Sequence, residues 1–242
     1  SDECDMADFL MIAPVFYRYH PPPVIIFLSL SRGFPKRSQA KETRMDELTA
    51  LEALADDRKA DDMRAYHKTE RRYLGVPNPA IDDLVKGWRS ERDLDQRLAL
   101  ASALWDSDIH EARVAAAKLL TQARIRPDDE AWRLIASWVP DFDGWAIADS
   151  VMIAGQKRLV ADPARLDQVE GWLTHPNKWT RRAALVGTLP WAKMNNPKMA
   201  DLAVRERVLG WAGQLAHEPD WFLQKAVAWW LRDLSKRDAE RV

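Results

Sequence analysis

Residues 138–179 read WVPDFDGWAIADSVMIAGQKRLVADPARLDQVEGWLTHPNKW and contain the same tryptophan pattern twice. Trp138 and Trp145 are seven residues apart, and so are Trp172 and Trp179. The second pair follows the first by 34 residues, a length that fits one pair of helices with short connections. This stretch therefore predicts helix pairs that stack side by side around a shared core.

The repeat extends in both directions from this stretch. Toward the N-terminus, Trp105 precedes Trp138 by 33 residues, and toward the C-terminus, Trp221 follows Trp179 by 42 residues because residues 193–201 are an insertion. Periods of this kind are typical of HEAT-class solenoids. We predict an all-α, HEAT-like helical-repeat solenoid with a concave face.

Helical patterning continues over nearly the whole chain from Asp46 onward, with no convincing strand. Pro, Asn and Asp residues interrupt this pattern and mark the predicted turns between helices. Asp162 before Pro163 is typical of an N-cap followed by a first-turn proline, and Pro127 before the acidic run 128–130 places negative charge at a helix start. Both sites are predicted helix beginnings.

The composition limits the classes of function. The apolar content of 47% is ordinary for a protein with a full core, and most of the twelve tryptophans are expected in that core. A single cysteine, Cys4, builds neither a disulfide framework nor a thiolate metal site and favours a reducing compartment. The formal charge is −1, but residues 166–242 carry 12 basic against 9 acidic side chains, so a local basic face is possible.

Residues 1–44 lack this helical patterning and are predicted to be a disordered extension, with the folded domain at 45–242. The apolar run Val24–Leu30 is too short to span a bilayer, so no membrane anchor is expected. Asp2, Glu3 and Asp5 stand where a signal peptide needs basic residues. We expect a cytoplasmic protein without membrane contact.

Trp145 and Asp149 are one helical turn apart, so an aromatic face and a carboxylate project from one surface of a predicted helix. That pairing suits a cationic transition state. The sequence lacks a Gly-rich phosphate loop, a His-x-x-x-His pair and a Gly-x-Ser-x-Gly elbow, and His110-Glu111 is interpreted as a helix-capping pair. We therefore expect neither a metal nor a cofactor.

Several ordered motifs between about residues 60 and 235 resemble one family. The motifs are MRAYHK at 63–68, YLGV at 73–76, LW at 104–105 with HE at 110–111, FDGWAIAD at 142–149, WTRRAA at 179–184 and QKAVAW at 224–229. Together they resemble the AlkD-type DNA alkylation repair glycosylases, all-helical HEAT-like proteins that remove positively charged alkylated purines from DNA.

The resemblance implies a site on the concave surface. It assigns Trp145, Asp149 and Trp229 to catalysis and Arg182 to DNA binding, with Tyr66, Lys68 and Arg181 as further candidates for DNA contact. The implied partner is double-stranded DNA that contains alkylated purines, bound by a monomer. This chain departs from the family pattern at Gly144, where an aromatic residue often precedes the site tryptophan, and in the insertion at 193–201.

The chemistry of the residues agrees with that implication. Alkylation of a ring nitrogen, as in N7-methylguanine or N3-methyladenine, leaves the purine cationic and already activated as a leaving group. Asp149 would then stabilise the oxocarbenium ion that forms on the sugar, while Trp145 and Trp229 supply π faces. The guanidinium of Arg182 would hold a phosphate.

Less specific interpretations of the same residues remain open. Either tryptophan could be core, Asp149 could pair with a neighbouring arginine, and Arg182 could be half of a surface ion pair. Two other functions also share the predicted fold. One is a catalytically silent relative that binds DNA structures, and the other is a helical-repeat scaffold that binds proteins.

Overall fold

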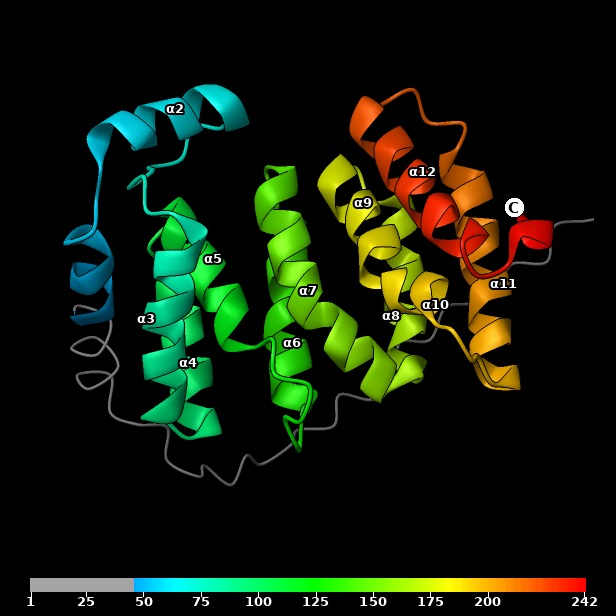
Figure 1. Ribbon diagram of the computed structural model, residues 1–242, viewed down its shortest axis with the longest axis horizontal. Coiled ribbons are helices and arrows are strands. Elements are labelled where there is room, and N and C mark those ends of the chain that lie inside the picture. Colours follow the sequence, from blue (N-terminus) through cyan, green and yellow to red (C-terminus); the bar gives the residue numbers. More distant parts are fainter. Residues whose placement is uncertain (1–45) are drawn as a thin grey trace, which may run out of the picture. The chain divides into compact units, whose positions relative to one another are not determined.

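A computed structural model describes residues 46–242, and Figure 1 shows how its helices are arranged. Over this range the regular elements are all helices, with one isolated bridge between Arg72 and Ile109 in place of any sheet. The predicted all-α helical-repeat fold is confirmed. The predicted disorder of residues 1–44 falls outside the described residues.

The helices follow one another with short connections. Residues 46–52 are helical. The later α-helices are α2 (Asp57–His67), α3 (Asn78–Ser90), α4 (Leu94–Trp105), α5 (His110–Leu119), α6 (Asp129–Trp138), α7 (Trp145–Ala161), α8 (Leu166–Glu170), α9 (Lys178–Gly187), α10 (Leu189–Lys193), α11 (Met199–Leu215) and α12 (Trp221–Ser235). Short 3-10 turns are η1 (Val139–Asp141), η2 (Pro163–Arg165), η3 (Gly171–Thr174) and η4 (Ala239–Arg241).

Two layers of helices account for the packing from α3 to α12. In one layer α3, α5, α7, α9 and α12 are successive neighbours, as the row in Figure 1 shows. The other layer contains α4, α6, α8 with η3, and α10 with α11, each packed on its counterpart in the first layer. A helix pair therefore forms the repeating unit, as the 34-residue tryptophan period predicts.

Helices α7, α9 and α12 run in the same direction. Near their starts, Arg182 of α9 contacts both Asp149 of α7 and the carbonyl of Phe222 of α12. Farther along, Gln156 of α7 donates to the carbonyl of Val186, which lies near the end of α9. The three N-termini consequently lie at one edge of the layer, and this edge positions the candidate site.

Contacts between neighbouring repeats recur at the repeat spacing. They join residues 36 to 42 positions apart, in the pairs Arg158 and Gln122, Trp132 and Gln168, Asn177 and Pro140, and Lys178 and Asp220. The widest spacing falls after the insertion at 193–201, where the tryptophan period is also longest. Equivalent positions of adjacent repeats thus touch, which is the physical basis of the period.

The tryptophans fill the space between the layers. Eight of the twelve are buried, including Trp138, Trp191 and Trp230. Trp105 and Trp138 stack with ring centroids 4.6 Å apart and an interplanar angle of 9°. The expectation that most tryptophans are core is confirmed, and the four that are not fully buried, Trp145, Trp179, Trp221 and Trp229, lie on α7, α9 and α12.

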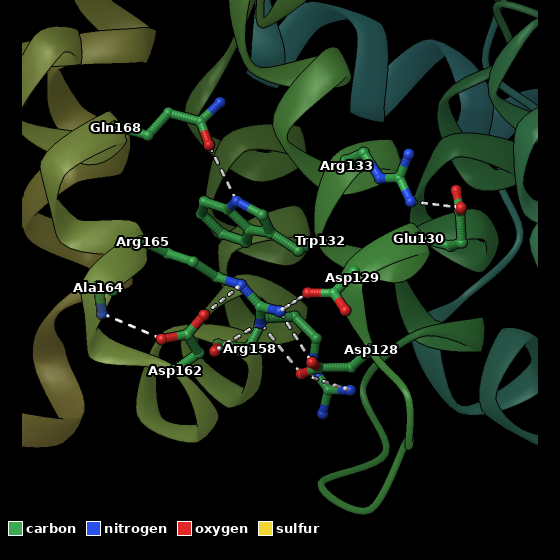
Figure 2. Close-up of polar contacts among 10 residues, drawn as sticks. All are labelled: Asp128, Asp129, Glu130, Trp132, Arg133, Arg158, Asp162, Ala164, Arg165 and Gln168. Atoms are coloured by element: carbon green, nitrogen blue, oxygen red, sulfur yellow. Dashed lines mark hydrogen bonds and ion pairs between the residues drawn. The ribbon is translucent and has the colours of Figure 1, made fainter. Parts of the chain in front are cut away.

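Both predicted helix beginnings are confirmed, with one difference in the capping. The side chain of Asp162 accepts from the amide of Ala164 and caps η2, which continues into α8. Asp128 occupies the N-cap position of α6 but makes no capping bond. Its carboxylate instead accepts two hydrogen bonds from Arg165, at 2.8 and 3.1 Å, and lies 3.5 Å from Arg158 (Figure 2).

Candidate functional site

Trp145 and Asp149 lie on consecutive turns of α7, at the edge formed by the N-termini. Trp145 is the first residue of the helix, after Gly144 in the N-cap position. Both side chains are partly exposed, and that of Asp149 has a relative exposure of 18%. An indole and a carboxylate therefore share one accessible surface, in the placement that the four-residue spacing predicts.

Arg182 of α9 holds the carboxylate of Asp149 from the neighbouring helix. Its Nε donates to Oδ1 at 2.9 Å and its Nη2 to Oδ2 at 2.8 Å, so the pair is bidentate. Its Nη1 donates to the carbonyl of Phe222 at 2.8 Å. The Arg182 side chain is only 7% exposed, which makes it a buried partner of Asp149 rather than a surface residue.

The bidentate pair leaves part of the carboxylate available. Two carboxylate oxygens offer about four lone-pair positions, and Arg182 takes two of them. The guanidinium of Arg182 also keeps free N–H groups, because three of its five are used within the protein. Asp149 is thus oriented by Arg182 and still accessible from the edge of the layer.

Aromatic rings from the N-terminal part of the chain gather around Trp145. The ring of Tyr66 meets Trp145 edge-on at 6.1 Å, and that of His67 lies 5.4 Å from it. Behind them, His67 stacks on Tyr73 and His110, and Tyr73 lies 4.7 Å from His110. The end of α2 is therefore brought to the start of α7.

Burial favours the neutral forms of the two imidazoles in this aromatic group. Burial, together with the nearby His67 and Arg71, lowers the pKa of His110 from 6.5 to about 3. Burial also lowers the pKa of His67. The two imidazoles consequently contribute flat, neutral surface beside Trp145 rather than cations.

Two buried charged residues fix the segment that carries these rings. Arg71 donates to Asp108 and to Asp143 at 2.6 Å each, and so ties the segment after α2 to the residues just before α7. Glu111 is fully buried and accepts from the backbone amides of Leu74 at 2.9 Å and Gly75 at 2.8 Å. Gly75 has a φ of +76°, which disfavours other residues there.

The capping interpretation of His110-Glu111 was wrong. The N-cap of α5 is Ile109, and no side chain caps this helix. The Glu111 carboxylate is directed at backbone amides 36 and 37 residues earlier, and the His110 ring joins the aromatic group. Both residues act between repeats, which a local motif does not reveal.

The other predicted DNA-contact residues lie near the same edge in different settings. Lys68 is exposed and follows the end of α2 in a left-handed conformation, with a φ of 56°. Arg181 is largely engaged within the protein, because its Nη1 donates to the carbonyls of His175 at 2.6 Å and Pro176 at 3.1 Å. Lys68 therefore remains a candidate for DNA contact, and Arg181 first stabilises the loop before α9.

Trp229 lies farther along α12 than the residue that contacts Arg182. It is seven residues beyond Phe222, a rise of roughly 10 Å along the helix. The ammonium group of Lys193 lies 5.4 Å from the centroid of its ring. The structure thus brings together Tyr66, Trp145, Asp149 and Arg182. The ring of Trp229, in contrast, contacts Lys193 of α10. The adjacent Trp230 is fully buried.

Within 46–242, no three His, Cys, Asp or Glu side chains gather in a way that could hold a metal ion. No helix in this range combines the length and the apolar character that crossing a membrane requires.

Comparison with known proteins identifies the family. The sequence model of the family described as DNA alkylation repair enzyme matches residues 48–242. The chain belongs to this family. The resemblance inferred from the motifs is thereby confirmed, and with it the expectation of a DNA alkylation repair enzyme.

A solved structure supports the fold of this repair enzyme. The structure described as "Predicted DNA alkylation repair enzyme from Enterococcus faecalis" superposes with a TM-score of 0.62. Its sequence is 22% identical, and the alignment covers 77% of this chain and 86% of that chain. No curated protein matches the sequence.

Sequence reasoning missed two elements of the site. One is the carbonyl of Phe222, which fixes Arg182 from α12. The other is the ion pair of Lys178 and Asp220, 2.8 Å apart, which joins the N-termini of α9 and α12. The only signal for the second was the placement of Asp220 directly before a helical run, where it also accepts from the amide of Phe222.

Proposed function

We propose that this repair enzyme is a DNA glycosylase that hydrolyses the N-glycosidic bond of cationic alkylated purines. One observation carries the proposal: Asp149 is held bidentately by Arg182 on an accessible surface, one turn from the partly exposed Trp145. A preorganised carboxylate of this kind stabilises a cation that develops beside it. Membership of the repair family supplies DNA as the substrate.

The reaction needs few groups. The bond between C1′ and the purine nitrogen breaks, and its electron pair goes to the base, which leaves neutral because alkylation had made it cationic. The sugar becomes an oxocarbenium ion, which Asp149 stabilises. The oxygen of a water molecule then bonds to C1′, and one of its protons passes to the carboxylate or to solvent.

The aromatic residues at the edge suit the charge of this substrate. In this proposal the ring of Trp145 lies against the cationic base or sugar, because cations favour the faces of aromatic rings. Tyr66 is 70% exposed and contacts Trp145, so it widens the same surface. The proposed complex is a monomer on double-stranded DNA, bound along the concave side of a HEAT-like array.

Arg182 takes a different role from the one that the sequence implies. Its hydrogen bonds to Asp149 and to Phe222 make it a positioning residue for the carboxylate. Two N–H groups of its guanidinium remain for a phosphate. The phosphate contact is therefore a secondary proposal, and orientation of Asp149 is the primary one.

Release of free base from a defined duplex tests the function. The enzyme is incubated with duplex DNA containing N7-methylguanine, and free 7-methylguanine is measured by chromatography. Asp149→Asn keeps the size of the side chain but removes its charge. We expect this change to lower release by about a hundredfold, since a lost preorganised group typically costs about 3 kcal/mol in the transition state.

Binding and an unmodified substrate provide the controls. Asp149→Asn should bind the duplex as tightly as the parent, because phosphate contacts dominate affinity. Unmodified DNA should yield no free guanine with either protein, since its leaving group carries no charge. A parent that binds DNA but releases no base, or an Asp149→Asn variant with the parental rate, would make the silent DNA-binding relative the better account.

A further inference from the structure

The residues after α2 run alongside the residues that lead into α7. At the end of α2, the rings of Tyr66 and His67 face Trp145, with centroid distances of 6.1 and 5.4 Å. Next to them, a Cβ atom added at Gly144 would lie 3.5 Å from the methyl group of Thr69, an ordinary van der Waals distance. Two adjacent residues at the start of α7 therefore lie against the end of α2 and the residues after it.

Arg71 makes the charged contact between these two segments. Its side chain is only 5% exposed, and it donates from Nη2 to Oδ2 of Asp143 and from Nη1 to Oδ1 of Asp108, at 2.6 Å each. Its Nε is buried and has no hydrogen-bond partner among the described residues. The two carboxylates therefore set the position of this guanidinium, because charge-assisted hydrogen bonds are stronger than neutral ones.

The two carboxylates link Arg71 to different elements. Asp108 lies just before α5, and the backbone makes a second link at the same place, since the amide of His110 donates to a carbonyl of the segment after α2 at 3.0 Å. Asp143 lies just before α7, and among the described residues its bond to Arg71 is the hydrogen bond that joins this segment to the start of α7. Loss of Asp143 therefore breaks the link to α7, whereas loss of Asp108 leaves a backbone link to α5.

The residues before α7 have a separate support on the side of α9. The side-chain amide of Asn177 donates to the carbonyls of Phe142 at 2.6 Å and of Pro140 at 3.1 Å. These bonds hold the backbone before α7 whether or not the carboxylate of Asp143 is present. A change at Asp143 should therefore affect the contact with Arg71 and leave the start of α7 in place.

We infer that Asp143 is a positioning residue for the candidate site, which acts through Arg71 to hold Tyr66 and His67 against Trp145. The inference rests on the proposed function in taking Trp145 as part of the reacting site. Cation–π attraction acts within about 6 Å of a ring centroid, so an aromatic surface built from two segments needs a fixed separation between its rings. The bond between Arg71 and Asp143 supplies that fixed separation.

The titration of His67 tests the contact without any base release. Burial lowers the pKa of His67 from its ordinary value of 6.5. If Asp143→Ala releases the end of α2, water reaches the imidazole, and the titration midpoint should rise toward 6.5. Proton NMR of the imidazole C–H resonances measures the midpoint, and a spectrum of His67→Gln identifies the resonance.

Asp108→Gly provides the matched control. It removes the other carboxylate that Arg71 binds, and glycine suits the left-handed backbone at this position, where φ is 57°. The His67 midpoint should keep its parental value in this variant, because the contact with Asp143 and the backbone link to α5 remain. The direct electrostatic effect of losing a carboxylate does not imitate the expected rise, since a nearby carboxylate stabilises the imidazolium ion and its loss lowers the pKa.

Single-turnover release from the N7-methylguanine duplex tests the consequence for the site. Asp143→Ala should lower the rate about tenfold, because small displacements of positioned groups slow reactions by up to about a hundredfold. Duplex affinity should change less than about twofold, because phosphate contacts dominate it. Asp143→Glu, whose carboxylate can still meet Arg71, should recover most of the rate, and Asp108→Gly should release base at the parental rate.

Melting temperatures show whether the variants are folded. Where Asp143→Ala is unfolded at the assay temperature, Asp143→Asn takes its place, because an amide of the same size binds Arg71 more weakly than a carboxylate does. The same directions of change are expected for this variant, with smaller amplitudes.

The outcomes separate this inference from the proposed function. If the His67 midpoint does not rise at Asp143→Ala, or if Asp108→Gly raises it equally, Asp143 does not hold the rings and the inference is wrong. If the midpoint rises while the variant releases 7-methylguanine as fast as an active parent, the contact does not position the site, which also overturns the inference. If the midpoint rises as expected but the parent releases no base, the glycosylase proposal fails and the positioning of the rings stands.

Discussion

At the level of single residues, the pair of Arg182 and Asp149 decides what each can do. The resemblance implies a phosphate-binding arginine and a catalytic carboxylate, and the sequence leaves open that Asp149 pairs with a neighbouring arginine. In the structure the guanidinium side chain is only 7% exposed and gives three hydrogen bonds to protein acceptors. We therefore propose that Arg182 acts on DNA chiefly through the carboxylate that it orients.

Arg182→Ala tests this assignment. We expect base release to fall at least tenfold because Asp149 loses its orientation, and the protein to lose about 3 kcal/mol of stability because the carboxylate is left unpaired. The slope of DNA affinity against salt should stay close to that of the parent. A slope lowered by about 0.9 would show that Arg182 contacts a phosphate after all.

Arg182→Lys serves as the conservative comparison. Lysine keeps the positive charge but lacks the planar fork that binds both oxygens of Asp149 and a third acceptor. Base release by this variant should therefore remain well below the parent, even where its melting temperature recovers. Full recovery of release would mean that charge alone, and not orientation, is what Arg182 supplies.

At the level of elements, the junction in Figure 2 joins the start of α6 to η2 and to the end of α7. Hydrogen bonds from Arg165 hold the pKa of Asp128 below its ordinary value, against the opposing effect of burial. The ionised carboxylate is thus favoured in the folded protein more than in the unfolded chain. Its contribution to stability is present above about pH 4 and is lost as pH falls through the lowered folded pKa.

Asp128→Asn tests this junction. The variant should be less stable than the parent at pH 7 by about 2 kcal/mol, because a charge-assisted pair is lost. The difference should shrink as pH falls below about 4, where the parental carboxylate also becomes protonated. Thermal unfolding followed by circular dichroism between about pH 2.5 and 7 measures both effects.

The pair of Glu130 and Arg133 on the same helix gives a matched control. Both side chains are about two-thirds exposed, so their ion pair is expected to contribute little. Glu130→Gln should change the melting temperature only slightly at any of these pH values. If Asp128→Asn and Glu130→Gln lower the melting temperature equally, the carboxylates at the start of α6 stabilise the helix in general. The specific contact of Asp128 with Arg165 would then not be the cause.

At the level of the whole molecule, the sequence predicts what repeats locally. The tryptophan period reveals the helix pairs because equivalent positions fill equivalent gaps, as Trp105 and Trp138 do. The placement of Trp145 and Asp149 follows from one helical turn. Both predictions depend only on spacing along the chain, and spacing is what a sequence records.

The rest of the site depends on where side chains and backbone groups point, and the spacing of residues along the chain does not show this. The sequence leaves open whether Asp149 pairs with an arginine but does not show that the guanidinium of Arg182 holds both carboxylate oxygens. The carbonyl of Phe222 belongs to the backbone, so no residue type marks it. Glu111 likewise binds amides of an earlier segment, where only the folded packing of two repeats brings them together.

The apolar core of the described residues is one continuous cluster, from Leu51 to Leu234. Adjacent repeats therefore share their buried surface, and we expect residues 46–242 to unfold in a single cooperative transition. Trp138, which is 3% exposed and stacked on Trp105, lies within this cluster. Truncating it leaves a cavity between two repeats.

Trp138→Ala should cost about 3 to 5 kcal/mol and lower the melting temperature by about 10 °C, since 1 kcal/mol corresponds to roughly 2–4 °C for a domain of this size. Differential scanning calorimetry should show the whole transition moving as one. Trp221→Ala, which removes an exposed ring, should leave the transition nearly in place. Two separate transitions, with only one of them shifted by Trp138→Ala, would show that the repeats unfold independently despite their shared core.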